Sequence, residues 1–292
     1  MNEKYENEVL YSPSKWCKRI EHNSVVKHHI NTVRKICQKI KTSQLNKSTN
    51  IRYGLGDQQL LDIYENKSMK SNSSTPSFVY IHGGYWQELE KDISAYCVEP
   101  LINSEIRVIV PGYDLAPKIS LGEIIDEIRQ LLSFLVNNLM FENIWLGGHS
   151  AGAHLAACMI LTAQQDFPEI KGFVLISGIY DLKPLLDTSI NSGLQLNETS
   201  CVECSPLHIL KGLNKSRRTS EILIVTAEDD SPAFKQQTSQ FRKFLVSRGL
   251  IVKEECVAGV DHFNIVENLS DKDFFLTKLI IKFILNSLCS KD

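Results

Sequence analysis

Short runs of apolar residues alternate with longer amphipathic segments through most of the chain. The apolar runs predict buried strands at residues 78–81, 106–110, 144–146, 173–176, 222–225 and 252–257. The amphipathic segments have apolar residues at three- and four-residue steps and predict helices at residues 121–139, 154–163, 234–246 and 274–288. Strands that alternate with helices of this length indicate an α/β fold, with a mostly parallel central sheet and helices on both faces.

The alternation of apolar runs and amphipathic segments is less regular near the N-terminus and at residues 181–219. Residues 1–48 are polar and rich in lysine, and a modest apolar periodicity predicts a mostly helical N-terminal extension. Residues 51–53 and 60–64 predict two strands joined by a glycine-containing turn. Residues 181–219 have a mixed composition and predict an excursion near the active site. Because α/β folds often reach about 250 residues as one unit, we expect a single domain over residues 1–292.

Composition narrows the set of partners. The chain has 32 basic and 34 acidic residues, so neither a nucleic acid nor an acidic membrane surface is expected to bind it. The first ten residues lack the apolar core of a secretory signal, and no apolar stretch is long enough to span a membrane. We therefore expect a cytoplasmic protein, either a monomer or a homodimer, whose eight cysteines stay reduced.

Two of the cysteines, Cys201 and Cys204, form a CxxC pair, and His208 follows four residues later. A zinc site needs four ligands in a recognisable pattern. One pair with one histidine is too small a set. We therefore expect buried thiols here, and neither a bound metal nor another cofactor.

The pentapeptide GHSAG at residues 148–152 lies between a predicted strand and a predicted helix. In that context G-x-S-x-G is typical of a nucleophilic serine on a tight turn. Small residues two positions before and after Ser150 let the turn close, and the turn lifts the Ser150 Oγ above the sheet. The N–H of Ala151, at the start of the helix, can then stabilise an oxyanion. The motif therefore predicts Ser150 as the nucleophile of a hydrolase.

An earlier strand runs into the sequence His82-Gly83-Gly84-Tyr85-Trp86. A glycine pair at this place leaves backbone N–H groups free to stabilise an oxyanion, as in the HGGG-type loop of α/β-hydrolases. The second donor is predicted among Gly83, Gly84 and Tyr85. His82 is expected to brace the loop rather than act as a base, and Trp86 fits either the core or a pocket wall.

Chain order selects the base. In this fold the catalytic residues follow one another as serine, acid and histidine. Only His208 and His262 follow Ser150 at a distance, and His208 precedes the last pair of strands. His262, which follows the strand at residues 252–257, is therefore predicted as the base.

The acid is expected after the preceding strand, where Glu228, Asp229 and Asp230 are adjacent. Its task is to fix the imidazole tautomer and to stabilise the imidazolium. The apolar periodicity of the chain does not indicate which of the three carboxylates is the acid. Asp261 is a weaker candidate, because its side chain should point away from the ring of its neighbour His262.

The combination of motifs resembles the kynurenine formamidase (arylformamidase) family, especially its insect and vertebrate cytosolic enzymes. The resemblance runs from about residue 50 to about residue 270. Its main segments are residues 82–88 (HGGYWQE), 148–155 (GHSAGAHL), 179–182 (IYDL), 230–232 (DSP) and 261–263 (DHF). The family's Asp-Ser pair matches Asp230-Ser231, so the resemblance selects Asp230 as the acid.

The resemblance implies hydrolysis of N-formyl-L-kynurenine to L-kynurenine and formate, in tryptophan degradation. A serine, an oxyanion hole and a proton from His262 suffice for this reaction without a metal. Tyr85, Trp86 and Phe263 are candidate walls of an aromatic pocket. Two alternatives stay open: a carboxylesterase of the hormone-sensitive-lipase-like group, which would prefer short acyl esters, and a non-catalytic ligand-binding homologue.

Overall fold

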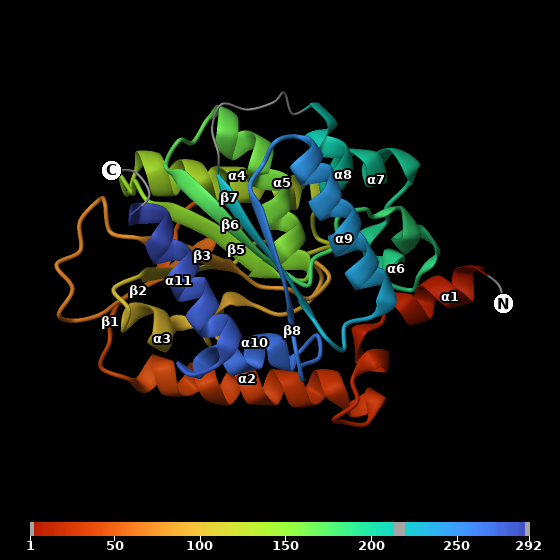
Figure 1. Cartoon of the computed structure of the whole chain (residues 1–292), viewed down its shortest axis with the longest axis horizontal. Coiled ribbons are helices and arrows are strands. Elements are labelled where there is room, and N and C mark those ends of the chain that lie inside the picture. The colour runs from red at the N-terminus through yellow and green to blue at the C-terminus, as the bar shows by residue number, and fades with distance from the viewer. Residues whose placement is uncertain (1–2, 213–219, 290–292) are drawn as a thin grey trace.

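The structure, a computed structural model, describes residues 3–212 and 220–289. Within these residues the centre is an eight-stranded sheet with the order β1-β2-β4-β3-β5-β6-β7-β8 (Figure 1). The strands are β1 (Asn46–Arg52), β2 (Leu60–Glu65), β3 (Ser77–Ile81), β4 (Arg107–Pro111), β5 (Ile144–His149), β6 (Ile170–Ile176), β7 (Glu221–Ala227) and β8 (Val252–Val257). Strands β3 to β8 pair in parallel, whereas β1 and β2 are antiparallel. The predicted α/β-hydrolase fold, with its mostly parallel sheet, is confirmed.

Helices fill most connections between the strands. The α-helices are α1 (Glu3–Leu10), α2 (Val25–Thr42), α3 (Val98–Ile102), α4 (Leu121–Asn137), α5 (Ala151–Gln165), α6 (Asn191–Leu194), α7 (Glu198–Cys204), α8 (Pro206–Ile209), α9 (Pro232–Ser247), α10 (Asn264–Glu267) and α11 (Phe275–Cys289). Short 3-10 helices are η1 (Pro13–Trp16), η2 (His22–Ser24), η3 (Lys91–Ile93), η4 (Lys183–Asp187), η5 (Leu210–Gly212) and η6 (Asn268–Ser270). The four predicted helices after residue 120 form, as α4, α5, α9 and α11. The short helices α3, α6, α7, α8 and α10 were not predicted.

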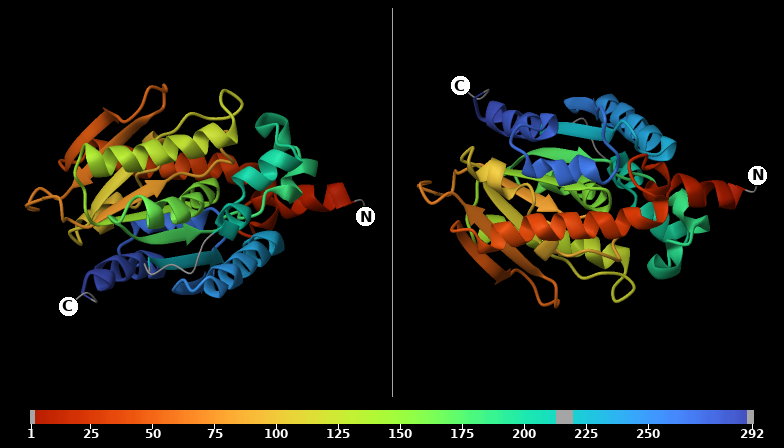
Figure 2. Two further views of the ribbon diagram at one scale, coloured as in Figure 1. Left: turned by 90° about the horizontal axis from the view of Figure 1, so that it is seen from above. Right: turned by 90° about the horizontal axis from the view of Figure 1, so that it is seen from below.

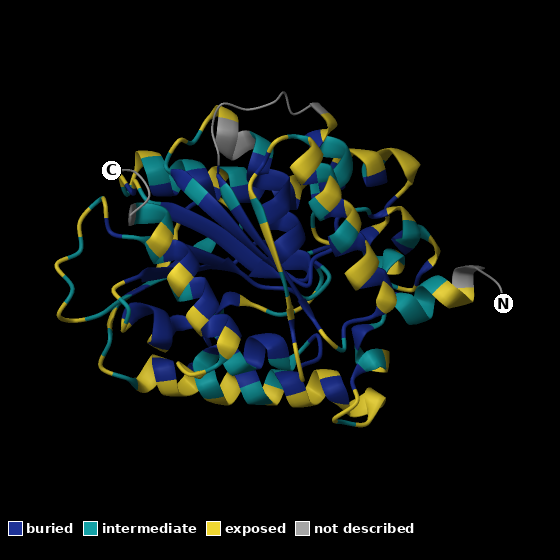
Figure 3. Ribbon diagram, in the orientation of Figure 1, coloured by how far each residue is buried: buried dark blue, intermediate teal, exposed yellow. Residues whose placement is uncertain are grey.

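The sheet separates two apolar cores. In β3, Val79 and Ile81 belong to the core that α4, α5 and α9 cover, whereas Phe78 and Tyr80 belong to the core of α2, α3 and α11. Successive residues of a strand point to opposite faces, and every residue of β3 is buried. Figure 2 shows helices on both faces of the sheet, and Figure 3 shows the central strands as buried. Burial on both faces explains why the central strands are continuous apolar runs in the sequence.

The described part of residues 1–48 contains the helices α1, η1, η2 and α2. Helix α2 runs along one side of the molecule (bottom of Figure 1) and buries Val33, Cys37 and Ile40 against the second core. None of the described helices is long and apolar enough to cross a membrane. The assignment of residues 1–292 to a single domain stays a prediction.

Candidate active site

Ser150 occupies the turn between β5 and α5. Its φ of 54° lies in the left-handed region, which residues other than glycine seldom adopt. A Cβ on Gly148 would lie 2.6 Å from the carbonyl oxygen of Ile81, and one on Gly152 would lie 2.1 Å from the same atom. Glycine is needed at both positions because the end of β3 approaches the turn so closely. The N–H of Ser150 donates to the carbonyl of Ile176 at 2.9 Å, which fixes the turn to β6.

His262 and Asp230 form a buried pair. Nδ1 of His262 lies 2.7 Å from Oδ1 of Asp230, and both residues are at most 3% exposed. The other carboxylate oxygen accepts the Oγ–H of Ser177 at 2.5 Å and the N–H of Ala227 at 2.8 Å. A carboxylate only accepts, so Nδ1 carries the proton and Nε2 of His262 can accept another one.

Ser177 was not among the predicted site residues. It follows β6 directly, with a φ of 48°. Its position at the carboxyl end of a parallel strand was the available signal, because functional side chains in open α/β sheets gather at that edge.

The two carboxylates that competed with Asp230 in the sequence have other partners. Asp229 pairs with Nζ of Lys18 at 2.5 Å, and Glu228 accepts a backbone N–H at 2.7 Å. Asp230 is thus the one of the three adjacent acids that contacts the ring of His262.

The glycine loop after β3 lies against the nucleophile. A Cβ on Gly83 would be 3.3 Å from the Cβ of Ser150. Gly84 has a φ of 102°, and the N–H of Glu88 donates to its carbonyl at 2.9 Å, which closes a tight turn. Tyr85, inside this turn, has a φ of 49°. The loop therefore brings its backbone next to Ser150, where an oxyanion would form.

His82 and Trp86 flank this loop in different ways. His82 stacks on Tyr113 with ring centroids 4.3 Å apart, and its Nδ1 lies 2.8 Å from the carbonyl oxygen of Gly83. Burial lowers the pKa of His82 to about 4, so the ring is neutral and suited to bracing. Trp86 is fully buried, packs edge-on against His154 and lies in the core. This corrects its prediction as a pocket wall: its ring packs into the core, outside the set of pocket-lining residues.

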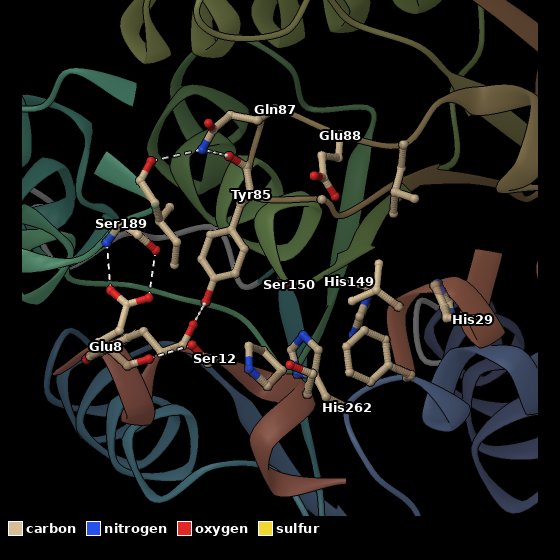
Figure 4. Close-up of a pocket in the computed structure, with 18 residues that line it drawn as sticks. Glu8, Ser12, His29, Tyr85, Gln87, Glu88, His149, Ser150, Ser189 and His262 are labelled. Atoms are coloured by element: carbon tan, nitrogen blue, oxygen red, sulfur yellow. Dashed lines mark hydrogen bonds between the residues drawn. The ribbon is translucent and has the colours of Figure 1, made fainter. Parts of the chain in front are cut away.

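Ser150 and His262 meet in a pocket of about 320 Å³ (Figure 4). The described residues that line it are Glu8, Tyr11, Ser12, Pro13, Ser14, Val26, His29, Gly84, Tyr85, Gln87, Glu88, Leu89, His149, Ser150, Ser189, Ile190, His262 and Phe263. The aromatic residues Tyr85 and Phe263 are among them. A serine, an imidazole with a buried carboxylate behind it and a glycine loop at one pocket can carry out nucleophilic acyl transfer.

Comparison with known proteins agrees with this geometry. A family model described as alpha/beta hydrolase fold matches residues 78–265. The kynurenine formamidases of Danio rerio and Salmo salar are 37% and 35% identical to the chain, and each alignment covers 96% of both sequences. The chain belongs to the kynurenine formamidase family.

Solved structures that resemble this family member show the same fold at lower sequence identity. Esterase B from Lactobacillus rhamnosis superposes with a TM-score of 0.71 at 17% identity, over 99% of the chain and 98% of the esterase. At that identity the similarity describes the fold, and the substrate must be argued from the pocket and from the family.

One side of the pocket comes from the N-terminal extension, which has none of the family motifs quoted above. The Oη–H of Tyr85 donates to the carbonyl of Tyr11 at 2.6 Å. The carboxylate of Glu8 accepts the N–H and the Oγ–H of Ser189 at 2.7 and 2.6 Å. These contacts attach α1 both to the glycine loop and to the excursion at residues 181–219. Sequence reasoning missed this part of the site because polar helices of this kind have no motif.

Arg19 fastens the extension to the loop that bears His262. Its Nε donates to Asp261 at 2.6 Å, and its Nη2 lies 3.1 Å from Glu267, which also contacts Nδ1 of His29 at 2.9 Å. Burial by itself raises the pKa of Asp261, but hydrogen bonds, the largest from Arg19, leave it below its ordinary value. The Asp261 carboxylate is thus hydrogen-bonded to Arg19 of the N-terminal extension.

The CxxC pair lies on α7, within the excursion. Cys201 and Cys204 are buried free thiols, and burial raises the pKa of each to about 11. Nδ1 of His208 contacts the Nζ of Lys211 at 2.8 Å. Among the described residues no cluster of three or more histidine, cysteine or acidic side chains could hold a metal. Residues 213–219 of the predicted excursion lie outside the described residues.

Proposed function

We propose that this chain hydrolyses N-formyl-L-kynurenine to L-kynurenine and formate, a step of tryptophan degradation. The observation that carries the proposal is the meeting of a strained-turn serine and the Asp230–His262 pair at one pocket, in a member of the kynurenine formamidase family. Ser150 is the nucleophile, His262 the general base and Asp230 the acid that orients the base.

In the first half of the reaction, Ser150 Oγ attacks the formyl carbon while Nε2 of His262 takes the hydroxyl proton. The carbonyl oxygen becomes an oxyanion, which backbone N–H groups of the loop Gly83, Gly84 or Tyr85 and of Ala151 stabilise. The C–N bond then breaks, and the imidazolium gives its proton to the aniline nitrogen. L-Kynurenine leaves, and a formyl ester on Ser150 remains.

In the second half, water replaces the amine. His262 takes a proton from the water as the oxygen attacks the formyl ester, and it returns a proton to Ser150 Oγ when the ester bond breaks. The product is formate. Neither half requires a metal or an organic cofactor.

The acyl side of the pocket fits the smallest acyl group. Gly83 lies so close to Ser150 that even a Cβ there would be 3.3 Å from the serine Cβ. The formyl carbon bears only hydrogen, so it needs no further room. The larger part of the substrate lies on the leaving-group side, where Tyr85 and Phe263 line the pocket.

The proposal is tested by kcat/KM for the formyl, acetyl and butyryl derivatives of the same kynurenine amine. Each methylene that does not fit costs about 1–3 kcal/mol of transition-state binding, so the values should fall about 10- to 200-fold for each added methylene. A short-chain nitrophenyl ester serves as comparison. Much faster turnover of the butyrate ester than of N-formylkynurenine would replace the proposal with a carboxylesterase, and no turnover of either would favour the non-catalytic homologue.

A cytoplasmic location and a solution state of monomer or homodimer belong to the same proposal. The support is the absence of a membrane-crossing helix among the described residues and the buried free thiols, of which Cys201 and Cys204 are examples. Cell fractionation and light scattering on the purified protein test these two points.

A further inference from the structure

The carboxylates that line the pocket are not balanced by lysine or arginine side chains among the described lining residues. They belong to Glu8 and Glu88. The ring of His149 adds no positive charge, because burial and the neighbouring His262 hold its pKa well below the ordinary value. The pocket therefore favours a ligand that presents a positive group.

The carboxylates of Glu8 and Glu88 differ in their hydrogen bonds. Glu8 is occupied by the two hydrogen bonds from Ser189. Within the described chain, the Glu88 carboxylate makes no hydrogen bond or ion pair, and the residue is exposed. Its backbone is fixed to Gly84, inside the turn that adjoins Ser150. Figure 4 shows the Glu88 side chain at the pocket, above Ser150 and His149 in that view.

His149 also lines the pocket, but its Nε2 is buried and makes no hydrogen bond within the described structure. Of the two carboxylates at the pocket, Glu88 is therefore the one that can bind a ligand through its exposed side chain.

We propose that Glu88 binds the α-ammonium group of the substrate. An ammonium has three N–H donors, and a carboxylate only accepts. In N-formylkynurenine the amino-acid side chain is ortho to the formamide, so the ammonium and the formyl carbon lie toward the same end of the ring. This inference rests on the proposed function, and it makes Glu88 a specificity-determining residue.

The test compares Glu88→Gln with wild type on three formanilides. N-Formyl-L-kynurenine carries the ammonium and the carboxylate, N-formylkynurenamine carries the ammonium alone, and 2-acetylformanilide carries neither. We expect kcat/KM of the variant to fall roughly 10- to 100-fold on the first two substrates, mainly through KM, because a charge-assisted hydrogen bond is weakened. On 2-acetylformanilide the change should stay below about twofold. Glu90→Gln, an exposed acid of the same loop outside this pocket, is the matched control.

Two outcomes would overturn the inference. An equal loss on all three substrates would mean that Glu88 shapes the glycine loop, and no loss on any of them would place the ammonium elsewhere. Wild-type turnover separates this failure from that of the proposed function. If wild type does not hydrolyse N-formylkynurenine, the function itself is wrong. If it does and Glu88→Gln fails to discriminate, only the ammonium site is wrong.

Discussion

The two sides of the pocket are built by different means. The side at the edge of the sheet, which we call the sheet-edge side, consists of Gly84, Tyr85, His149, Ser150, His262 and Phe263. The other, the N-terminal side, consists of Glu8, Tyr11, Ser12, Pro13, Ser14, Val26 and His29. Backbone geometry holds the first side, through strand ends and residues with positive φ. Side-chain contacts between distant parts of the chain hold the second, such as Arg19 with Asp261.

The difference follows from what each side has to do. A nucleophile and an oxyanion site need atoms at fixed places, and only a few residue types can adopt the backbone that provides them. A wall that encloses the rest of the substrate needs only to fit, and many sequences provide that. The sheet-edge side therefore has sequence motifs, and the N-terminal side has none.

The largest effect is expected on the sheet-edge side, from Ser150→Ala. The protein should fold, because the variant removes one oxygen at a residue that is 4% exposed, and activity should fall about 10⁴- to 10⁶-fold. Turnover of N-formylkynurenine and far-ultraviolet circular dichroism measure the two properties. A variant that kept a tenth of the wild-type activity would exclude Ser150 as the nucleophile.

A second change on the same side separates adjacent acids. Asp230→Asn should lower kcat about 10⁴-fold, because the amide no longer holds the tautomer and charge of His262. Asp229→Asn, its matched control, removes only a contact with the exposed Lys18, and we expect a change below about threefold. If the two variants exchanged their effects in steady-state assays, the assignment of the acid would be off by one residue.

On the N-terminal side, Arg19→Ala should act first on stability. It leaves the carboxylate of Asp261, which is 3% exposed, without its cation, whereas Glu267 keeps its contact with His29, and loss of one partner from a buried pair costs about 3 kcal/mol. We expect a fall in kcat of about tenfold, because Asp261 adjoins His262. Arg19→Lys should recover part of both losses. Denaturant unfolding measures the loss of stability, and steady-state assays measure the loss in kcat. An unchanged unfolding midpoint would show that the contact of Arg19 with Asp261 does not stabilise the extension.

The same pair predicts a pH dependence. The pKa of Asp261 in the folded state lies below its ordinary value of 3.8, so its contribution to stability is fully present above that pH. The contribution is lost as the pH falls through the lowered pKa. The difference in unfolding free energy between wild type and Arg19→Ala should therefore be constant above about pH 5 and shrink below pH 3.8. A difference that grew on acidification would contradict the pairing.

The smallest effect is expected from metal removal. Both sides of the pocket complete the proposed chemistry with protein groups, and the cysteine pair at Cys201 and Cys204 is buried in α7. Prolonged treatment with EDTA should leave kcat/KM unchanged within error. A loss of activity that added zinc restored would make the serine route secondary.

The sequence by itself was sufficient for the chemistry-bearing side. Continuous apolar runs predicted the parallel sheet, since strands buried on both faces leave no polar alternation. The pentapeptide around Ser150 and the glycine loop were recognisable because steric contacts restrict them to few residue types. For example, a Cβ on Gly152 would lie 2.1 Å from the carbonyl oxygen of Ile81. The order of serine and histidine along the chain then left one candidate base.

Tertiary structure decided what local patterns leave open. Periodicity left the choice among three adjacent carboxylates open, the family resemblance selected Asp230, and only the structure shows its contact with His262 in space. The inward turn of Trp86 and the bond from Ser177 to Asp230 depend on packing between distant strands. The N-terminal side of the pocket arises from contacts between residues far apart in the chain, from 74 positions for Tyr11 with Tyr85 to 242 for Arg19 with Asp261. A local sequence pattern indicates which backbone conformation the residues can adopt. The contacts that each side chain makes across the fold depend on how the whole chain packs.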